Sequence, residues 1–147
     1  ELNSEYNFNE DKTGLSLISS LAYSYGDDTS GSEDKELTSI EPFKAILGLR
    51  YKDSENKWST ELTNTYVGDA RTTDSLDDNP SKSYSVLDLT SVFNVNERLS
   101  VDLGIFNLND TRYFNYSTVK SQNSSSADIN RFSEPGRNIK AGFKFIF

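Results

Sequence analysis

The chain ends on the stretch RNIKAGFKFIF, residues 137–147, in which apolar and polar side chains alternate. Successive side chains of a β-strand point to opposite faces, so this pattern predicts a strand with one apolar face and one face that carries Lys140 and Lys144. An apolar environment must cover the first face. Its side chains are Ile139, Ala141, Phe143, Phe145 and Phe147.

The same alternation recurs along most of the chain, whereas helical periodicity is rare. It predicts an all-β, antiparallel protein of about seven strands. In the second strand, for example, Leu15, Leu17 and Leu21 share a face. The fourth strand shows the weakest pattern, because Thr60 and Asn64 interrupt its apolar row. The expected strands are 1–8, 13–26, 41–53, 57–69, 82–95, 98–109 and 137–147.

Charged side chains take the face opposite the apolar rows. They are expected to line an interior that is polar, as in a transmembrane barrel whose outer face contacts lipid. Aromatic residues such as Tyr51, Trp58 and Phe93 lie near strand ends, where membrane barrels place interfacial aromatic girdles. The charged residues on the polar face are Lys44, Arg50, Glu61, Asp88, Asp102, Lys140 and Lys144.

The connections between the expected strands alternate in length. Short polar turns at 9–14, 53–57 and 95–98 alternate with long loops at 27–40, 70–81 and 110–136. Short turns at one rim and long loops at the other are the layout of an up-and-down outer-membrane barrel, although a soluble antiparallel barrel or sandwich also has polar turns. The acidic stretches in the first two loops lack EF-hand spacing, so we expect solvated loop there.

Composition excludes several function classes. The chain has 147 residues and contains no Cys and no His, so it cannot supply a catalytic Ser-His-Asp or Cys-His arrangement, a disulfide, or a His-ligated zinc or haem site. The net charge of -8 argues against nucleic acid as a partner. We therefore expect a protein that is not an enzyme and that carries no catalytic, cofactor or metal site in these residues.

Two segments near the end resemble TonB-dependent outer-membrane receptors. The stretch 85–117 contains a strand with a central Asp88, a tight turn and a Gly-x-x-Asn-Leu-x-Asp-x-x-Tyr motif, and 134–147 contains Pro-Gly-Arg before the last strand. Upstream, a Leu-x-Ser-Ile-x-Pro motif and a Gly-Leu-x-Tyr strand resemble the haem and haemoglobin branch of this family. The motif residues are Gly104, Asn107, Leu108, Asp110, Tyr113, Pro135, Gly136 and Arg137, then Leu37, Ser39, Ile40, Pro42, Gly48, Leu49 and Tyr51.

The resemblance implies the following expectations. Residues 1–147 form the C-terminal part of a barrel of about 22 strands in the bacterial outer membrane, and the plug domain that fills such a barrel lies outside them. The parent receptor takes up haem or haemoglobin iron with energy from the TonB complex, which contacts the missing N-terminal region. Haem is then a transported ligand rather than a cofactor. A ferric-siderophore receptor, an unrelated outer-membrane protein and a soluble barrel remain alternatives.

Two sets of candidate functional residues follow. The last strand, with Ile139, Ala141, Phe143, Phe145 and Phe147, resembles the signal that the barrel-assembly machinery recognises, and an ordinary lipid-facing strand is the structural alternative. The 110–136 loop exceeds the usual length of a connection, and its aromatic side chains are candidates for contact with a protein ligand, or alternatively for the girdle at the rim. These candidates are Tyr113, Phe114, Tyr116 and Phe132.

Overall fold

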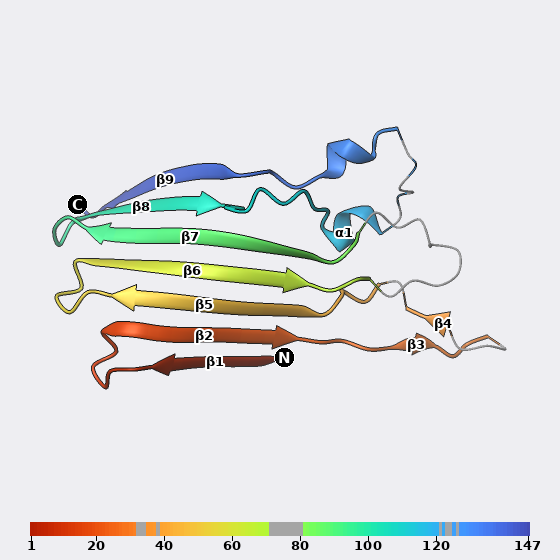
Figure 1. The fold of residues 1–147 in the computed structure, drawn as a ribbon, viewed down its shortest axis with the longest axis horizontal. Coiled ribbons are helices and arrows are strands. Elements are labelled where there is room, and N and C mark those ends of the chain that lie inside the picture. The colour runs from red at the N-terminus through yellow and green to blue at the C-terminus, as the bar shows by residue number, and fades with distance from the viewer. Residues whose placement is uncertain (32–34, 38, 71–80, 121, 123–124, 126) are drawn as a thin grey trace.

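The computed structural model describes all residues except 32–34, 38, 71–80, 121, 123–124 and 126. Its described residues form one antiparallel seven-stranded sheet in the order β1-β2-β5-β6-β7-β8-β9 (Figure 1). The expected all-β, antiparallel, up-and-down fold is thus confirmed. The strands are β1 (Leu2–Asn7), β2 (Gly14–Ala22), β5 (Lys44–Lys52), β6 (Trp58–Val67), β7 (Tyr84–Asn94), β8 (Leu99–Phe106) and β9 (Asn138–Phe145).

The sheet is open. β1 and β9 are its two edges, and no pairing between them occurs in the described part of the chain. An isolated open sheet with an exposed apolar face would be unfavourable in water, because unpaired edges and apolar surface promote association. The seven strands therefore have the form of a section of wall, and they do not close into a ring of their own.

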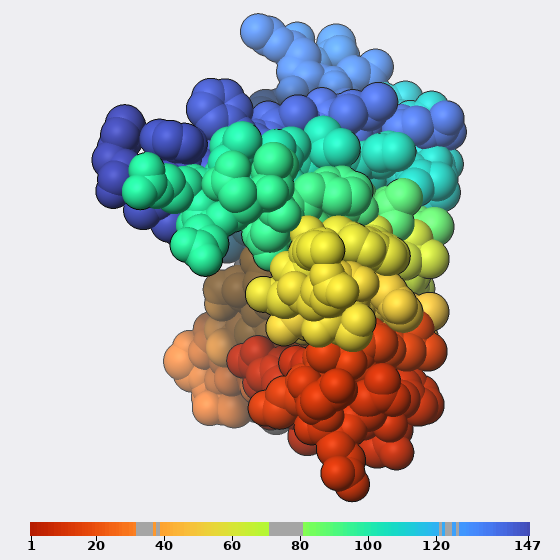
Figure 2. All heavy atoms as spheres, turned by 90° about the vertical axis from the view of Figure 1, so that its left-hand side faces the viewer, coloured from red at the N-terminus to blue at the C-terminus, as the bar shows by residue number. Residues whose placement is uncertain are grey.

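The connections are sorted between the two ends of the sheet, as predicted. The short turns after β1, β5 and β7 all lie at the end where the chain finishes, and the longer connections lie at the opposite end (Figure 1). Seen from the short-turn end, the red, yellow and green turns follow one another across the molecule (Figure 2). We call the opposite end, with the connections 23–43, 68–83 and 107–137, the long-loop rim.

One row of apolar side chains crosses the whole sheet. Directly paired residues lie on the same face, and the register pairs an apolar residue of each strand with an apolar residue of the next. We call this the apolar row. It consists of Tyr6, Leu17, Leu49, Leu62, Leu89, Ile105 and Ile139.

The next row along the strands faces the opposite way and is polar. It also crosses every strand, and its members are paired directly, so the charges predicted for this side do share one face. Side chains on this polar face are more covered: Ser16 is 3% exposed, whereas Leu17 beside it is 39% exposed. The polar row consists of Asn7, Ser16, Arg50, Glu61, Thr90, Gly104 and Lys140.

The two polar residues that interrupt the apolar face in β6 are hydrogen bonded. The hydroxyl of Thr60 lies 2.6 Å from that of Ser91 and donates to the carbonyl oxygen of Thr90 at 3.0 Å. The amide of Asn64 donates to the hydroxyl of Ser85 at 2.8 Å. Because each polar group has a hydrogen-bond partner within the sheet, the apolar face can contact hydrocarbon at these positions without leaving a polar group unsatisfied.

Some strands are shorter than predicted. The second ends at Ala22 rather than at residue 26, because the partner strand β5 starts only after Pro42, which has no N–H to donate to a ladder. The sixth ends at Phe106 rather than at residue 109, because Asn107 has a φ of 52° and leaves the extended conformation.

The long connections hold small elements that the sequence analysis did not predict. Residues Asp27–Asp28 (β3) and Lys35–Glu36 (β4) pair as a short hairpin. The connection after β8 contains a single helical turn, α1 (Tyr116–Val119), and a 3-10 helix at Ile129–Phe132. The acidic stretch 74–78 lies outside the described residues. No helix in the described part of the chain is long and apolar enough to cross a membrane.

Candidate functional site

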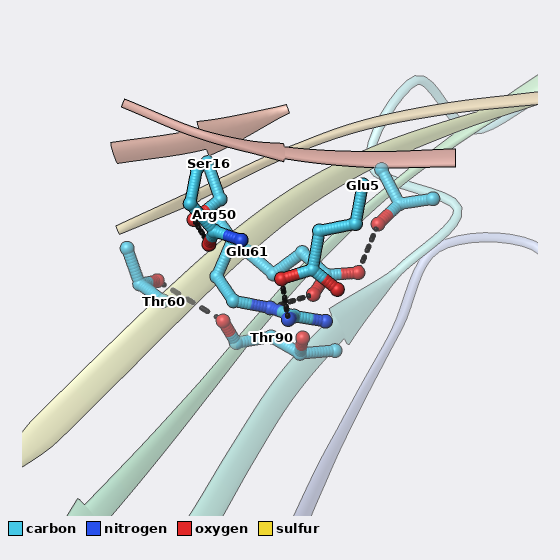
Figure 3. Close-up of polar contacts among 8 residues, drawn as sticks. Glu5, Ser16, Arg50, Thr60, Glu61 and Thr90 are labelled. Carbon is cyan, nitrogen blue, oxygen red and sulfur yellow. Dashed lines mark hydrogen bonds and ion pairs between the residues drawn. The ribbon is translucent and has the colours of Figure 1, made fainter. Parts of the chain in front are cut away.

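A network of charges occupies the middle of the polar face. The Arg50 guanidinium lies between two carboxylates: its Nε donates to Glu61 Oε2 at 2.8 Å, and its Nη1 lies 3.6 Å from Glu5 Oε1 (Figure 3). Thr63 donates a further hydrogen bond to Glu61 at 2.9 Å. Arg50 links β1, β5 and β6 on this face, and it neutralises carboxylates that would otherwise repel each other.

A cavity of about 310 Å³ opens on the polar face at the long-loop rim. Four of its lining residues form a directly paired row across β2, β5, β6 and β7. Residues of the connection after β8, at the start of α1, form the opposite wall. The cavity therefore lies between the sheet and that connection, and its lining combines Glu41, Lys44 and Tyr84 with small and apolar groups. The paired row is Ala22, Lys44, Val67 and Tyr84.

A second cavity of about 220 Å³ lies on the same face, above β7, β8 and β9. Its floor includes Asp88 and the ring of Phe106, and the Lys140 ammonium lies 4.9 Å from the centre of that ring. This is within the range of a cation–π contact. Glu134 and Tyr113 close the cavity from the loop side. Acidic, basic and aromatic groups thus meet at this position.

Gly104 makes room for the Phe106 ring. A Cβ at position 104 would lie 2.5 Å from Cε2 of Phe106, closer than Cβ atoms come to their neighbours. Phe106 points to the polar face, like Gly104, because the two residues are two apart in the same strand. Its ring lies across the wall at the floor of the second cavity, and the sequence analysis did not single it out.

The Gly-x-x-Asn-Leu-x-Asp motif proves to be a structural junction. Asn107 is 2% exposed; its backbone N–H donates to Asp88 at 2.7 Å, and its side-chain amide donates to the carbonyl oxygens of Thr111 and Pro135 at 2.8 and 3.1 Å. Thr111 N–H returns a bond of 2.8 Å to Asn107 Oδ1. These bonds join β7, the end of β8 and the residues before β9.

Asp110 completes this junction. Its φ of 53° is left-handed, a conformation that Asn and Asp adopt more readily than most residues. Its carboxylate accepts a 2.8 Å hydrogen bond from the N–H of Arg137, which is next to the first residue of β9. A Cβ atom at position 136 would lie 2.9 Å from Oδ1 of Asp110, so glycine allows the chain to approach this carboxylate closely. The Pro-Gly-Arg sequence therefore fits against the motif it follows in the chain.

The four aromatic candidates of the 110–136 loop fall in different environments. Tyr116 is 2% exposed, and Phe132 is 36% exposed. Tyr113 is half-buried and stacks on Tyr84 of the wall, with ring centres 4.3 Å apart, and Phe114 is half-buried with the Arg112 guanidinium 5.8 Å from its ring centre. The structure brings Tyr113 and Tyr116 to the two cavities but leaves Phe132 apart, on the 3-10 helix. Their contact with a ligand stays a prediction.

Burial changes the acid–base properties of the two loop tyrosines. Burial raises the pKa of Tyr113 above the ordinary value for a phenol, and the nearby Glu134 raises it further. The pKa of Tyr116 is raised for the same main reason, with a smaller contribution from Glu41. Both phenols therefore stay neutral at physiological pH and can act as hydrogen-bond donors or acceptors in these cavities.

The residues proposed as an assembly signal lie on the outer face of β9, except for Phe147, which follows it. Ile139, Ala141, Phe143 and Phe145 pair with apolar residues of β8, and Ile139 and Phe143 are 76% and 81% exposed. The ring of Phe147 contacts that of Phe145 with centres 5.4 Å apart. The structure confirms one apolar face for this strand, and recognition by an assembly machinery stays a prediction.

Part of the site was missed by the sequence analysis. Tyr84, Phe106 and Val86 point to the polar face, where only charged side chains were singled out. A signal existed for all three, because Tyr84 and Val86 have the parity of Asp88 in β7, and Phe106 has the parity of Asp102 in β8. In the described residues no group of three or more Asp and Glu side chains is arranged to hold a metal ion.

Comparison with known proteins adds an independent result. Residues 1–108 match the family described as TonB dependent receptor-like, beta-barrel. The chain is 26% identical over 134 residues to Hemoglobin-binding protein A of Haemophilus influenzae and 24% identical over 130 residues to Lactoferrin-binding protein A of Neisseria meningitidis serogroup B. Each alignment covers 76% of this chain. The chain spans only 13% and 14% of the length of these relatives.

A solved structure has the same fold. The Copper transporter OprC superposes with a TM-score of 0.76 at 22% identity, over 97% of this chain and 23% of that one. At this level of identity the similarity concerns the arrangement of strands alone.

Proposed function

Because this chain belongs to the family of TonB-dependent receptor β-barrels, we propose that it forms part of the wall of a transport receptor in the bacterial outer membrane. The observation that carries the proposal is the apolar row, which crosses all seven strands from Tyr6 to Ile139 and is opposed by the polar row. A lipid-facing apolar surface around a polar interior is the arrangement that a transmembrane barrel requires. Residues 1–147 are one part of a larger barrel, and the plug and the TonB-contacting segment lie elsewhere in the receptor.

The proposed ligand is haemoglobin, with haem as the transported group. Relatives named for haemoglobin binding support this choice, as do the Leu37 and Gly48 motifs, although a relative named for lactoferrin is similar to the same degree. A protein ligand requires capture outside the membrane, and the long-loop rim is the end of the wall suited to it. In this proposal the chain acts by binding and transport rather than by catalysis.

The test of this ligand is competition binding on the full receptor. Cells that produce it should bind labelled haemoglobin saturably, and unlabelled haemoglobin should displace the label while a ferric siderophore does not. Lactoferrin and free haem are the further competitors. If only the siderophore displaces the label, or if cells grow on siderophore iron but not on haemoglobin iron, the ligand is a siderophore and the haemoglobin proposal is wrong.

Phe132 offers a test within this chain. It is the most exposed of the four aromatic candidates, and an aromatic anchor at an interface often contributes more than about 1 kcal/mol to binding. We expect Phe132→Ala to weaken haemoglobin binding by about tenfold. Phe8→Ala is the matched control, since Phe8 is 58% exposed at the short-turn end and should not affect binding. Equal affinity of both variants and the wild type would remove Phe132 from the contact.

The last strand is proposed to be the segment that the barrel-assembly machinery recognises. The Phe147→Ala variant should lower the amount of folded receptor in the outer membrane through loss of recognition. Loss of packing should contribute little, because the Phe147 ring is fully exposed and contacts the ring of Phe145. Phe8→Ala again serves as control. A purified Phe147→Ala receptor that refolds as well as the wild type, but assembles poorly in cells, would separate recognition from stability.

A further inference from the structure

Part of the connection between β8 and β9 lies over the polar face of the wall at the long-loop rim, where Tyr113, Tyr116 and Glu134 line cavities together with strand residues. Both cavities lie between this connection and the sheet, one over β2, β5, β6 and β7 and the other over β7, β8 and β9. We call the described residues 107–120 and 128–137 the rim strap. If the polar face lines the lumen, the rim strap projects into the lumen and narrows it.

Side-chain burial fastens the rim strap in its middle. Tyr116 and Val119 of α1 are 2% and 0% exposed, and Tyr113 stacks on Tyr84 of the wall. Val119 is the most completely buried large side chain of the described residues. Lifting the rim strap from the wall would expose Tyr113 and Tyr116, which line the cavities together with strand residues, and this loss of buried surface opposes such a motion.

Hydrogen bonds fasten the rim strap at its two ends. The N–H of Glu134 donates to the carbonyl oxygen of Tyr113 at 3.0 Å, and Asn107 and Asp110 hold Pro135 and Arg137. These bonds tie the residues that leave β8 to the residues that enter β9. Segments that move in transport or gating are usually those with few buried contacts, and the part of the rim strap from Asn107 to Val119 does not have that character.

We propose that the rim strap is a fixed constriction of the lumen, which stays against the wall while ligand binds and passes. This inference rests on the proposed function only in its assumption that the polar face lines a transport path. It assigns Tyr113 and Tyr116 to anchoring the constriction, and it leaves ligand capture to more exposed groups such as Phe132. A passing ligand moves beside the rim strap and does not displace it.

The first test can be made without the ligand and then repeated with it. Spin labels on the full receptor at Ser117 of the rim strap and Ser54 of the turn after β5 report the distance from the strap to the far end of the wall. Labels at Ser54 and Ser83 are the matched control, since Ser83 directly precedes β7 and its N–H donates a hydrogen bond to Asp69, close to the end of β6. We expect equally narrow distance distributions for both pairs, with and without haemoglobin. A second distance for Ser117 alone would overturn the proposal.

The second test fixes the rim strap covalently. Tyr84→Cys combined with Tyr113→Cys places two thiols where the rings now stack, and a short bifunctional thiol reagent joins them. The joined receptor should take up haemoglobin iron as fast as the same variant before joining; loss of uptake on joining, with binding kept, would overturn the proposal. A wild-type receptor that takes up no haemoglobin iron would instead refute the proposed ligand. The spin-label distances measured without haemoglobin would then still test whether the rim strap keeps one position against the wall.

Discussion

The backbone N–H of Asn107 donates a 2.7 Å hydrogen bond to the carboxylate of Asp88, and this bond joins the end of β8 to the middle of β7. Two residues that are 19 apart in the chain thus fix the position at which β8 stops and the rim strap begins. The side chain of Asn107 extends the junction to Pro135. These hydrogen bonds give the family motif that contains Asn107 a structural role.

Asn107→Ala should destabilise the receptor by about 2–4 kcal/mol. It removes buried hydrogen bonds, which cost roughly 1–3 kcal/mol when partners are left unsatisfied, and it places Ala at a φ of 52°, which costs about 1 kcal/mol more. Asn107→Gly keeps the left-handed backbone and should recover the smaller part of this loss. Urea unfolding of the full receptor in vesicles measures both. Equal stability of Asn107→Ala and the wild type would show that the junction does not support the fold.

Gly104→Ala should destabilise the wall by about 1–3 kcal/mol, the usual cost of overpacking. The added methyl group would lie 2.5 Å from the Phe106 ring, so the ring would have to leave its place under Lys140. Adding Phe106→Leu should restore most of the loss, since the smaller side chain leaves space for the methyl group. A double-mutant cycle by urea unfolding tests this, and strictly additive effects would contradict the proposed contact.

Tyr113 should ionise above the ordinary phenol value of about 10. Burial raises the pKa of Tyr113 in the folded state, so the stabilisation from the neutral phenol is complete below the ordinary value and is lost as pH rises through the raised folded pKa. Alkaline absorbance titration of the wild type minus Tyr113→Phe isolates this group. A difference spectrum with its midpoint at or below the ordinary value would mean that the ring is not covered by the wall.

Leu62→Arg and Thr63→Arg should differ strongly, although the residues are adjacent. Leu62 belongs to the apolar row, where Arg near the middle of a bilayer costs about 2–4 kcal/mol. Thr63 lies on the polar face and contacts Glu61, so Arg there should change stability by less than about 1 kcal/mol. Unfolding in vesicles compares the two variants. Similar costs would contradict the assignment of the two faces.

Much of the wall could be predicted from the sequence, because side chains alternate between two faces and each strand of the wall pairs with the next wall strand along the chain. The strands and the common face of Arg50 and Glu61 followed from side-chain parity, and the short turns at 9–14, 53–57 and 95–98 followed from their polar residues and their length. Strand ends were less accessible, because they depend on a partner. β2 ends at Ala22 since Pro42 delays β5, and nothing in the sequence of β2 itself reports this.

The candidate site was predicted only in part, because it depends on contacts between distant segments. The long 110–136 loop was identified as unusual, but the burial of Tyr116 against the wall depends on where that loop folds. The stack of Tyr84 on Tyr113 joins residues from β7 and from the loop after β8, and no periodicity connects them. The motif around Asn107 was recognised from a family resemblance, and its hydrogen bonds supply the physical reason for it.

The central claim is that the apolar row contacts lipid and the polar row lines an aqueous interior. The most direct measurement places a single cysteine, labelled with a small fluorophore, at Leu49 or at Arg50 of a cysteine-free full receptor in vesicles of brominated phospholipid. Leu49 and Arg50 are neighbours in β5 but belong to opposite rows. We predict strong quenching by the brominated chains at position 49 and weak quenching at position 50. Equal quenching at both positions, or stronger quenching at 50, would contradict the account.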